Sequence, residues 1–215
     1  WRTYAQSGLE EMAAGTTVPV INSLSDDFHP CQLLADLLTI REHKGSLAGL
    51  TVTFVGDGGS NMAQSYALAG ATAGMHVRIA CPETFKPGAS VVGDARAIAE
   101  TTGGSIAVLH QLDDAVAGSD VVVTDTWVSM GKEEEKAERV ATFGPFQVGA
   151  PAMALAKDDA IFLHCLPADR GFEVTPEVID GPQSVIWDES ENRLHAQKAL
   201  MVWLLERAES STSRR

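Results

Sequence analysis

From residue 50 onward, short runs of apolar and mostly β-branched residues alternate with segments of helical periodicity. Strands that are apolar on both faces are typical of a parallel sheet covered by helices on its two sides. The alternation therefore predicts an α/β fold, a doubly wound parallel sheet flanked by helices. Six strands are expected, at residues 50–55, 76–80, 105–109, 120–124, 160–163 and 184–187.

Helices are expected in the intervals between these runs, and a glycine follows three of them. A glycine can adopt the left-handed conformation that ends a helix. The three helices are predicted at 61–73, 90–102 and 113–117, ending at Gly74, Gly103 and Gly118. A last helix is expected at 191–207, because acidic residues near its start and Arg207 near its end suit the helix dipole.

The first 44 residues follow a different pattern, with a helical piece at 9–14, a strand-like segment at 18–21 and an amphipathic stretch at 30–43. We interpret residues 1–44 as the C-terminal remnant of a second α/β domain together with a linking helix. Residues 45–190 form the doubly wound domain in this interpretation. Residues 191–215 form a C-terminal helix that packs back on the first domain and ends in a frayed tail.

Composition narrows the classes of protein that fit. The 215 residues are 45% hydrophobic and carry a net charge of −13, which disfavours binding to nucleic acid. Three cysteines are too few for a disulfide framework, so a cytoplasmic location is expected. Apolar runs are too short to span a membrane. The start at Trp1 is neither an initiator Met nor a signal peptide, which suggests a piece of a longer chain.

Polar clusters follow three of the predicted strands, at residues 56–61, 124–131 and 164–167. Open α/β sheets bind ligands beyond the carboxyl ends of their strands, where the strand order reverses. With the strand order 3-2-1-4-5, the first and fourth strands are neighbours at that point and the fifth lies alongside. We therefore expect the three clusters to form one site.

Each cluster also has a simpler interpretation. The glycines at 56–59 suit a tight turn, and Asp125 suits a helix cap. A dinucleotide-binding motif is the main rival, but Asn61 stands where that motif has its third glycine, so a nicotinamide enzyme is disfavoured. The charged run 132–139 is typical of a solvated loop, with a substrate lid as the alternative.

The sequence neighbours of Cys165 and of His29 each favour a ligand site. A lone cysteine is usually a small buried hydrophobe. Cys165, however, follows His164 and precedes a Leu166–Pro167 bond, which is a candidate for a cis peptide. His29 precedes Pro30 at a predicted helix start, a place where polar groups can bind a ligand, and its simpler interpretation is a helix cap.

These motifs together resemble the ornithine carbamoyltransferases, over nearly the whole chain. The matching segments are His29-Pro30-Cys31-Gln32, Gly56-Asp57-Gly58 with Asn61-Met62, residues 125–131, His164-Cys165-Leu166-Pro167 and residues 191–197. The resemblance implies transfer of a carbamoyl group from carbamoyl phosphate to the δ-amine of L-ornithine, in arginine biosynthesis, with no cofactor and no metal. It identifies residues 1–44 with the end of the carbamoyl phosphate-binding domain and residues 45–190 with the ornithine-binding domain.

The resemblance also implies a role for each matching residue. The catalytic residues would be His29, Asp125, Cys165 and Arg193. Carbamoyl phosphate would be bound by His29, Gln32, Cys165, Leu166 and Arg193. Ornithine would be bound by Asn61, Asp125, Ser129, Met130 and Cys165. The sequence departs from many relatives at Ser60, Gln64 and Gly149, outside these assigned roles.

The Ser-Thr-Arg-Thr phosphate-binding motif of the family does not occur in these 215 residues. We therefore expect this chain alone to be inactive and the complete protein to be a homotrimer. A non-catalytic module that binds an amino acid is the alternative hypothesis. Titration with ornithine and with carbamoyl phosphate distinguishes the two, because a simple amino-acid-binding module needs no response to carbamoyl phosphate.

Overall fold

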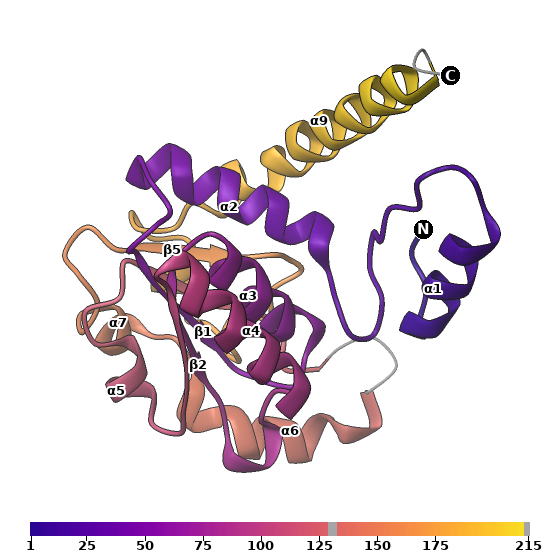
Figure 1. Cartoon of the computed structure of the whole chain (residues 1–215). Helices are drawn as coiled ribbons and strands as arrows, with labels where there is room; N and C mark the ends of the chain where they lie inside the picture. The colour runs from indigo at the N-terminus through magenta and orange to yellow at the C-terminus, as the bar shows by residue number, and fades with distance from the viewer. Residues whose placement is uncertain (129–132, 213–215) are drawn as a thin grey trace.

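The computed structural model of the chain describes residues 1–128 and 133–212, and its centre is a five-stranded parallel sheet (Figure 1). The strand order is β3-β2-β1-β4-β5, which confirms the predicted doubly wound sheet and its order. The strands are β1 (Thr51–Val55), β2 (His76–Ala80), β3 (Ser105–Leu109), β4 (Val121–Thr124) and β5 (Ile161–His164).

The sixth predicted strand, at 184–187, is wrong. Ser184 makes one isolated bridge to Phe162, and helix α9 (Ile186–Thr212) begins two residues later. Ile186 is apolar because it packs beneath the sheet, where it is 1% exposed. The largely apolar segment 184–187 thus contains the end of a loop and the first turn of a helix. Periodicity alone does not distinguish these from a strand.

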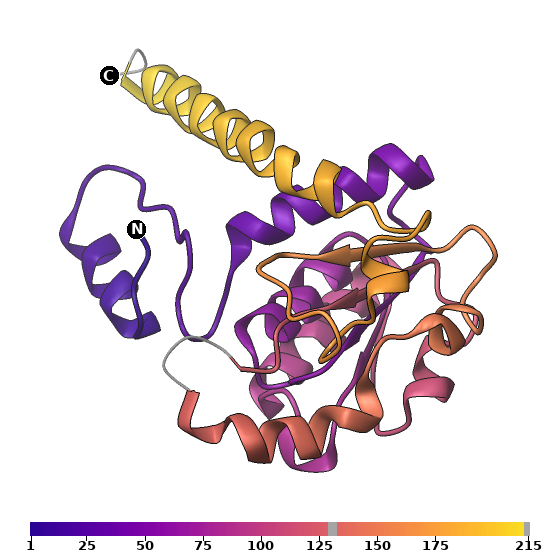
Figure 2. The same ribbon diagram turned by 180° about the vertical axis from the view of Figure 1, so that it is seen from behind.

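Helices cover both faces of the sheet (Figures 1 and 2). One face is covered by α2 (Pro30–Lys44), α3 (Asn61–Thr72) and α4 (Ala89–Thr102), and the other by α5 (Leu112–Val116), α7 (Ala150–Met153) and α8 (Pro176–Ile179). Helix α6 (Lys136–Phe143) follows β4. Three short 3₁₀ helices span Glu83–Phe85, Glu133–Glu135 and Gly144–Phe146. As predicted, Gly74, Gly103 and Gly118 have positive φ, at 72°, 83° and 68°.

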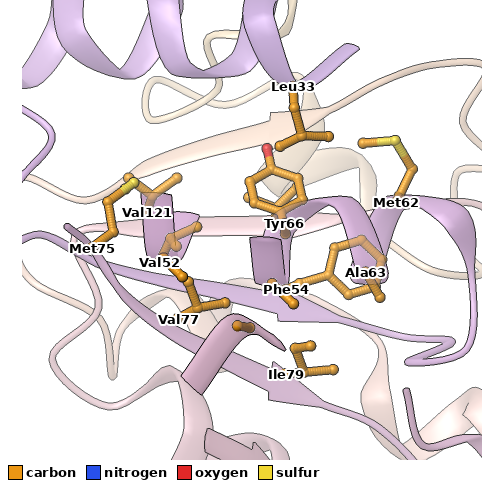
Figure 3. Close-up of a cluster of buried hydrophobic side chains, with 14 of the residues drawn as sticks. Leu33, Val52, Phe54, Met62, Ala63, Tyr66, Met75, Val77, Ile79 and Val121 are labelled. Carbon is orange, nitrogen blue, oxygen red and sulfur yellow. The ribbon is translucent and has the colours of Figure 1, made fainter. Parts of the chain in front are cut away.

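The alternation of side chains along each strand divides the core into two clusters. On one face, Val52 and Phe54 of β1 pack with Tyr66 of α3 (Figure 3). On the other face, Val55 and Phe162 pack with residues of α5, α7 and α8. Because both faces are buried, the strands are apolar throughout, as the sequence pattern indicates.

The N-terminal region lies to one side of the sheet and contains α1 (Gln6–Gly15) (Figure 2). The expected strand at 18–21 is wrong, since this segment is irregular. It lines an apolar groove of about 600 Å³ with residues of α2, α3 and α9, including Leu34, Leu200 and Leu204. The outer part of α9 projects from the body of the molecule in both views, and Met201 and Trp203 are about half exposed. In the described part of the chain, no helix is both long enough and apolar enough to cross a bilayer.

Two glycines are required by close packing. A Cβ atom at Gly58 would lie 2.6 Å from the Phe85 carbonyl oxygen and 2.9 Å from the Cys81 sulfur. A Cβ atom at Gly70 would overlap Cγ2 of Val77, so this glycine sets how closely α3 approaches β2. The glycine-rich turn after β1 is therefore explained by protein packing at Gly58, without a bound phosphate.

We predict that Gly70→Ala lowers the free energy of unfolding by about 1 to 3 kcal/mol, because the added methyl group overpacks the α3–β2 contact. Gly93→Ala is the matched control, since Gly93 lies in α4 with nothing within 4 Å of the added atom. That change should stabilise the helix by about 0.5 to 1 kcal/mol. Urea denaturation measures both. Equal effects of the two variants would contradict the packing argument.

Candidate functional site

The candidate site lies at the carboxyl ends of β1, β4 and β5, beside the N-terminus of α2. Strand β4 pairs with both β1 and β5, with Val55 opposite Thr124 and Thr124 opposite His164. The predicted clusters after these strands therefore meet at one edge of the sheet. Two groups of side chains occupy this edge, and Glu189 of α9 connects them.

The first group is centred on Asp125 and Cys165. The Cys165 thiol donates a hydrogen bond to Oδ1 of Asp125 across 3.2 Å. Burial and the charge of Asp125 raise the pKa of Cys165 well above its usual value, so the sulfur keeps its proton at neutral pH. Burial likewise raises the pKa of Asp125, although neighbouring His164 opposes the shift. A protonated thiol beside a carboxylate offers hydrogen bonds to an amine rather than a thiolate nucleophile.

His164 is held rigidly behind this pair. Its Nδ1 accepts the N–H of Leu166 across 2.9 Å, so the ring proton lies on Nε2, which is 3.1 Å from Oε1 of buried Glu173. Leu166 has φ of 56°, and its bond to Pro167 is cis, as expected from the sequence. The side-chain ligand atoms of Asp125, His164 and Cys165 lie within 4.8 Å of one another. Because both ring nitrogens of His164 are already engaged, the trio is not a ready metal site.

The second group begins with His29, the residue that precedes α2. The backbone N–H of His29 donates to Oγ of Ser65 across 2.8 Å, and the ring is 6% exposed. Burial, then the charges of Arg193 and Arg2, lower the pKa of His29 to about 4. The imidazole is therefore neutral at physiological pH. Its Nδ1 is buried without a hydrogen-bond partner in the described structure, so it remains available to a ligand.

Gln32 and Arg193 complete this group. Arg193 donates from Nη1 to Oε1 of Gln32 across 2.7 Å. Nε2 of Gln32 donates to Asp36 and to Glu189, at 2.8 and 3.2 Å. Gln32 is fully buried, whereas Arg193 is half-buried. Arg193 is thus the cation of this group that a ligand can reach.

The remaining predicted residues lie at the margins or outside the described residues. Asn61 begins α3, and its Nδ2 donates to the carbonyl oxygen of Ser25 across 3.1 Å. Ser65, which contacts His29, lies one helical turn further on. Ser129 and Met130 fall outside the described residues. The three departures are structural: Ser60 caps α3, Gln64 bonds the Asp27 carbonyl, and Gly149 precedes α7.

The expectation of a solvated loop at 132–139 is wrong for the described residues 133–139, which are helical, and Arg139 among them is 3% exposed. Its guanidinium forms an ion pair with Asp57 of the turn after β1 and donates to the Trp127 carbonyl oxygen. It also lies 5.1 Å from the ring centres of Phe85 and Phe143. Arg139 therefore anchors the backbone at Trp127, close to the segment 129–132, to the turn that precedes α3.

Four buried polar residues of the site were not among the predicted ones: Asp36, Tyr66, Glu173 and Glu189. A signal for Asp36 is present in the sequence, because it lies one turn after Gln32 on the face of α2 that also carries Leu33 and Ile40. Glu189 lies near a helix start, where the helix dipole already explains an acidic residue. The sequence therefore gives no reason to expect that Glu189 is buried. Glu173 follows no periodic segment and gives no signal.

Comparison with known proteins matches two family models to this chain. The model described as "Aspartate/ornithine carbamoyltransferase, Asp/Orn binding domain" matches residues 48–204. The model described as "Aspartate/ornithine carbamoyltransferase, carbamoyl-P binding domain" matches residues 1–42. Together these matches include the turn after β1, both groups of the site and most of α9.

Individual relatives agree with the family models. A protein of Clavibacter sepedonicus named ornithine carbamoyltransferase is 73% identical over 205 residues, which are 95% of this chain and 67% of the relative. A namesake from Renibacterium salmoninarum is 66% identical over 97% of this chain and 67% of its own length. The structure of ornithine carbamoyltransferase from Pyrococcus furiosus superposes with a TM-score of 0.89 at 50% identity, covering 93% of this chain and 64% of that one. The chain thus spans about two thirds of the length of these relatives.

We predict that Arg139→Met destabilises the protein by about 3 to 5 kcal/mol, because it leaves Asp57 as a buried charge without its partner. Arg170→Met is the matched control, since the Arg170–Asp180 pair is solvent-exposed and should contribute little to stability. Chemical denaturation at constant salt measures both. A loss of stability in Arg139→Met no larger than that in Arg170→Met would show that the Arg139–Asp57 pair does not anchor the backbone at Trp127.

Proposed function

Because the chain belongs to the aspartate/ornithine carbamoyltransferase family, we propose that the protein containing it transfers a carbamoyl group from carbamoyl phosphate to the δ-amine of L-ornithine. The products are L-citrulline and phosphate, as in arginine biosynthesis. The observation that carries the proposal is the Asp125–Cys165 pair, placed beside the group formed by His29, Gln32 and Arg193. One group suits an amine and the other suits an acyl phosphate.

The charges around Asp125 favour ornithine over aspartate as the acceptor. Among the described residues, the groups that shift the pKa of Asp125 are His164, Cys165, the Thr126 N–H and Glu173, and none is Arg or Lys. A carboxylate in such surroundings attracts a cationic side chain and repels a second carboxylate. We therefore assign Asp125 and the Cys165 sulfur to the amine side of ornithine. By the family resemblance, Asn61, Asp125, Ser129 and Met130 bind its α-amino and α-carboxylate groups.

The second group acts on the carbonyl of carbamoyl phosphate. With its ring proton on Nδ1, the nitrogen that has no partner in the described structure, neutral His29 donates a hydrogen bond to the carbonyl oxygen as negative charge develops there. Arg193 adds a positive charge nearby. We assign Gln32 and the Leu166 carbonyl to the carbamoyl amide. Gln32 offers it the second lone pair of Oε1, since both of its amide protons are already donated. Holding both substrates in contact converts the reaction into an intramolecular one, which can supply a large part of the rate.

The reaction then proceeds in two steps, addition of the amine and expulsion of phosphate. The lone pair of the neutral δ-amine attacks the carbonyl carbon and gives a tetrahedral centre. The carbon–oxygen bond to phosphate breaks, and the departing phosphate takes up the proton lost by the amine.

We assign residues 1–44 to the carbamoyl phosphate domain with its linking helix, 45–190 to the ornithine domain and 191–215 to the returning helix. We also expect a cytoplasmic homotrimer for the complete protein.

A citrulline assay tests this function. Residues 1–215 are extended with the part of the Clavibacter sepedonicus relative that precedes the aligned segment, which should supply the phosphate-binding motif absent here. This extended protein should form citrulline, whereas residues 1–215 alone should not. Calorimetric binding of ornithine by the extended protein without any response to carbamoyl phosphate would instead favour the amino-acid-binding module.

In the extended protein, Asp125→Asn and Cys165→Ala should each reduce kcat/KM for ornithine by an amount equal to about 2 to 4 kcal/mol, because both groups face the amine. The dissociation constant of carbamoyl phosphate, measured by calorimetry, should stay unchanged. Asp114→Asn serves as the control, since Asp114 is an exposed residue of α5. Equal losses for both substrates would contradict the assignment of these residues to the ornithine side.

The rate of citrulline formation should rise with pH between about 6 and 9, because only the neutral δ-amine attacks and an amine of this kind has a pKa near ~10.4. His29 does not contribute to the rise. Its pKa of about 4 lies below this range, so the imidazole is already neutral. The measurement is log(kcat/KM) for ornithine against pH. A flat profile would mean that amine deprotonation does not limit the reaction.

A further inference from the structure

Two buried carboxyl groups meet behind the candidate site, outside the set of residues assigned to the substrates. Asp36 of α2 and Glu189 of α9 are 0% and 1% exposed, and one nitrogen, Nε2 of Gln32, donates to both carboxyl groups, at 2.8 and 3.2 Å. Two carboxylates in contact in a buried place cannot both ionise, because each disfavours the charge of the other. The contact therefore requires a proton between them.

The neighbouring groups determine which carboxyl keeps that proton. Burial raises the pKa of Asp36 to about 6, while hydrogen bonds from Tyr66 and Gln32 limit the shift. Burial and the charge of Asp36 raise the pKa of Glu189 further above its usual value. Of the two carboxyl groups, Glu189 is therefore the one that holds the proton more readily, and Asp36 the one that carries the charge. The charged and titratable groups that face the pair are Tyr66 of α3, Arg193 of α9 and Cys165 after β5.

The pair is connected to both halves of the site. Oε2 of Glu189 accepts the backbone N–H of His164 across 2.8 Å, at the end of β5. Oδ2 of Asp36 accepts the Tyr66 hydroxyl across 2.7 Å, and Figure 3 shows this hydroxyl leaving the apolar core in the direction of Leu33. Each carboxyl group therefore has a fixed position, set by a strand on one side and a core helix on the other.

Through Gln32 the pair controls Arg193. Nε2 of Gln32 donates to both carboxyl groups, and its Oε1 is left to accept Nη1 of Arg193. A reversed amide would place its oxygen against the charged Asp36 carboxylate and its NH₂ against a guanidinium, which are both repulsive contacts. The orientation of the Gln32 amide, and with it the position of the Arg193 guanidinium, follows from the carboxyl pair.

We propose that Asp36 and Glu189 share one proton and act together as positioning residues, fixing the Gln32 amide so that its oxygen holds Arg193 toward carbamoyl phosphate. The link to carbamoyl phosphate rests on the proposed function, whereas the orientation of Gln32 does not. Neither carboxyl group touches a substrate. Their effect reaches the reaction through a cation that is half-buried and accessible to the ligand.

The kinetic test uses the citrulline-forming extended protein and three variants. In Glu189→Gln the new amide can donate to Asp36 and accept from His164 N–H, but it no longer accepts from Gln32 Nε2, whose shorter bond to Asp36 remains. KM for carbamoyl phosphate should therefore rise by less than about tenfold, with KM for ornithine unchanged. In Asp36→Asn the new side chain cannot accept all of the donors that Asp36 accepts, so KM for carbamoyl phosphate should rise about tenfold to a hundredfold with KM for ornithine unchanged. Glu191→Gln, at an exposed position of the same helix, is the control.

A second test needs no activity and uses residues 1–215. The side-chain NH₂ protons of Gln32, assigned by their loss in Gln32→Glu, should exchange far more slowly in nuclear magnetic resonance spectra than those of exposed Gln111. Their signals should shift as Asp36 titrates near pH 6. Glu189→Gln should preserve the slow exchange, and Asp36→Asn should abolish it. Retention of slow, pH-independent exchange in Asp36→Asn would overturn the proposal.

The two tests separate the possible failures. Absence of citrulline from the extended wild-type protein would overturn the proposed function, and the spectra of residues 1–215 would still decide the role of the pair. Equal rises in both KM values in Asp36→Asn would indicate general disruption and overturn the positioning role. A rise of tenfold or more in KM for carbamoyl phosphate in Glu189→Gln would overturn the shared proton.

Discussion

The parallel pairing of β4 with β1 on one side and β5 on the other is the constraint on which the site depends. This pairing places Val55, Thr124 and His164 at one edge of the sheet, although Val55 and His164 are more than 100 residues apart in the sequence. Everything that follows these strands must then share a small volume. The Asp57 turn, the Asp125 pair with Cys165 and the loop at Leu166 are neighbours because the strands are.

The pairing also creates an electrostatic problem, which the protein resolves with protons and hydrogen bonds. Asp125, Glu189 and Asp36 all lie near this edge, and burial disfavours their ionised forms. Each carboxyl group is accompanied by a donor, from the Cys165 thiol to the Tyr66 hydroxyl. The result is a site whose negative charge is confined to a few carboxyl groups, while the reachable cation, Arg193, lies one turn beyond Glu189 on α9.

The features that the sequence predicts well are those set by local periodicity. Strands β2 and β3 have the predicted bounds, because each apolar run is bounded by residues that end it, such as Gly74 and Gly104. The same reasoning is wrong at 184–187, where Ile186 is apolar for a helix rather than a strand. Local pattern identifies burial there but not the element.

The features that the sequence does not predict are set by contacts between distant residues. Nothing in the charged run 132–139 distinguishes Arg139 from its neighbours, because its partner Asp57 lies 82 residues away. Glu173 becomes a partner of His164 only when the loop after β5 folds back. By contrast, the predicted clusters after β4 and β5 do meet, through Cys165 and Asp125, since both residues directly follow adjacent strands. Their roles toward substrates remain predictions.

The spacing of Glu189 and Arg193 on α9 has a consequence for how this chain can vary in length. The two residues are four positions apart, so they lie one turn apart on the same face of the helix. One contacts the end of β5 and the other contacts α2 through Gln32. Inserting or deleting a single residue between them would rotate the rest of the helix by about 100°. The contact of Glu189 with β5 and the contact of Arg193 with Gln32 could then not both form. The segment 189–193 can therefore accept substitutions at its exposed positions, but its length is fixed.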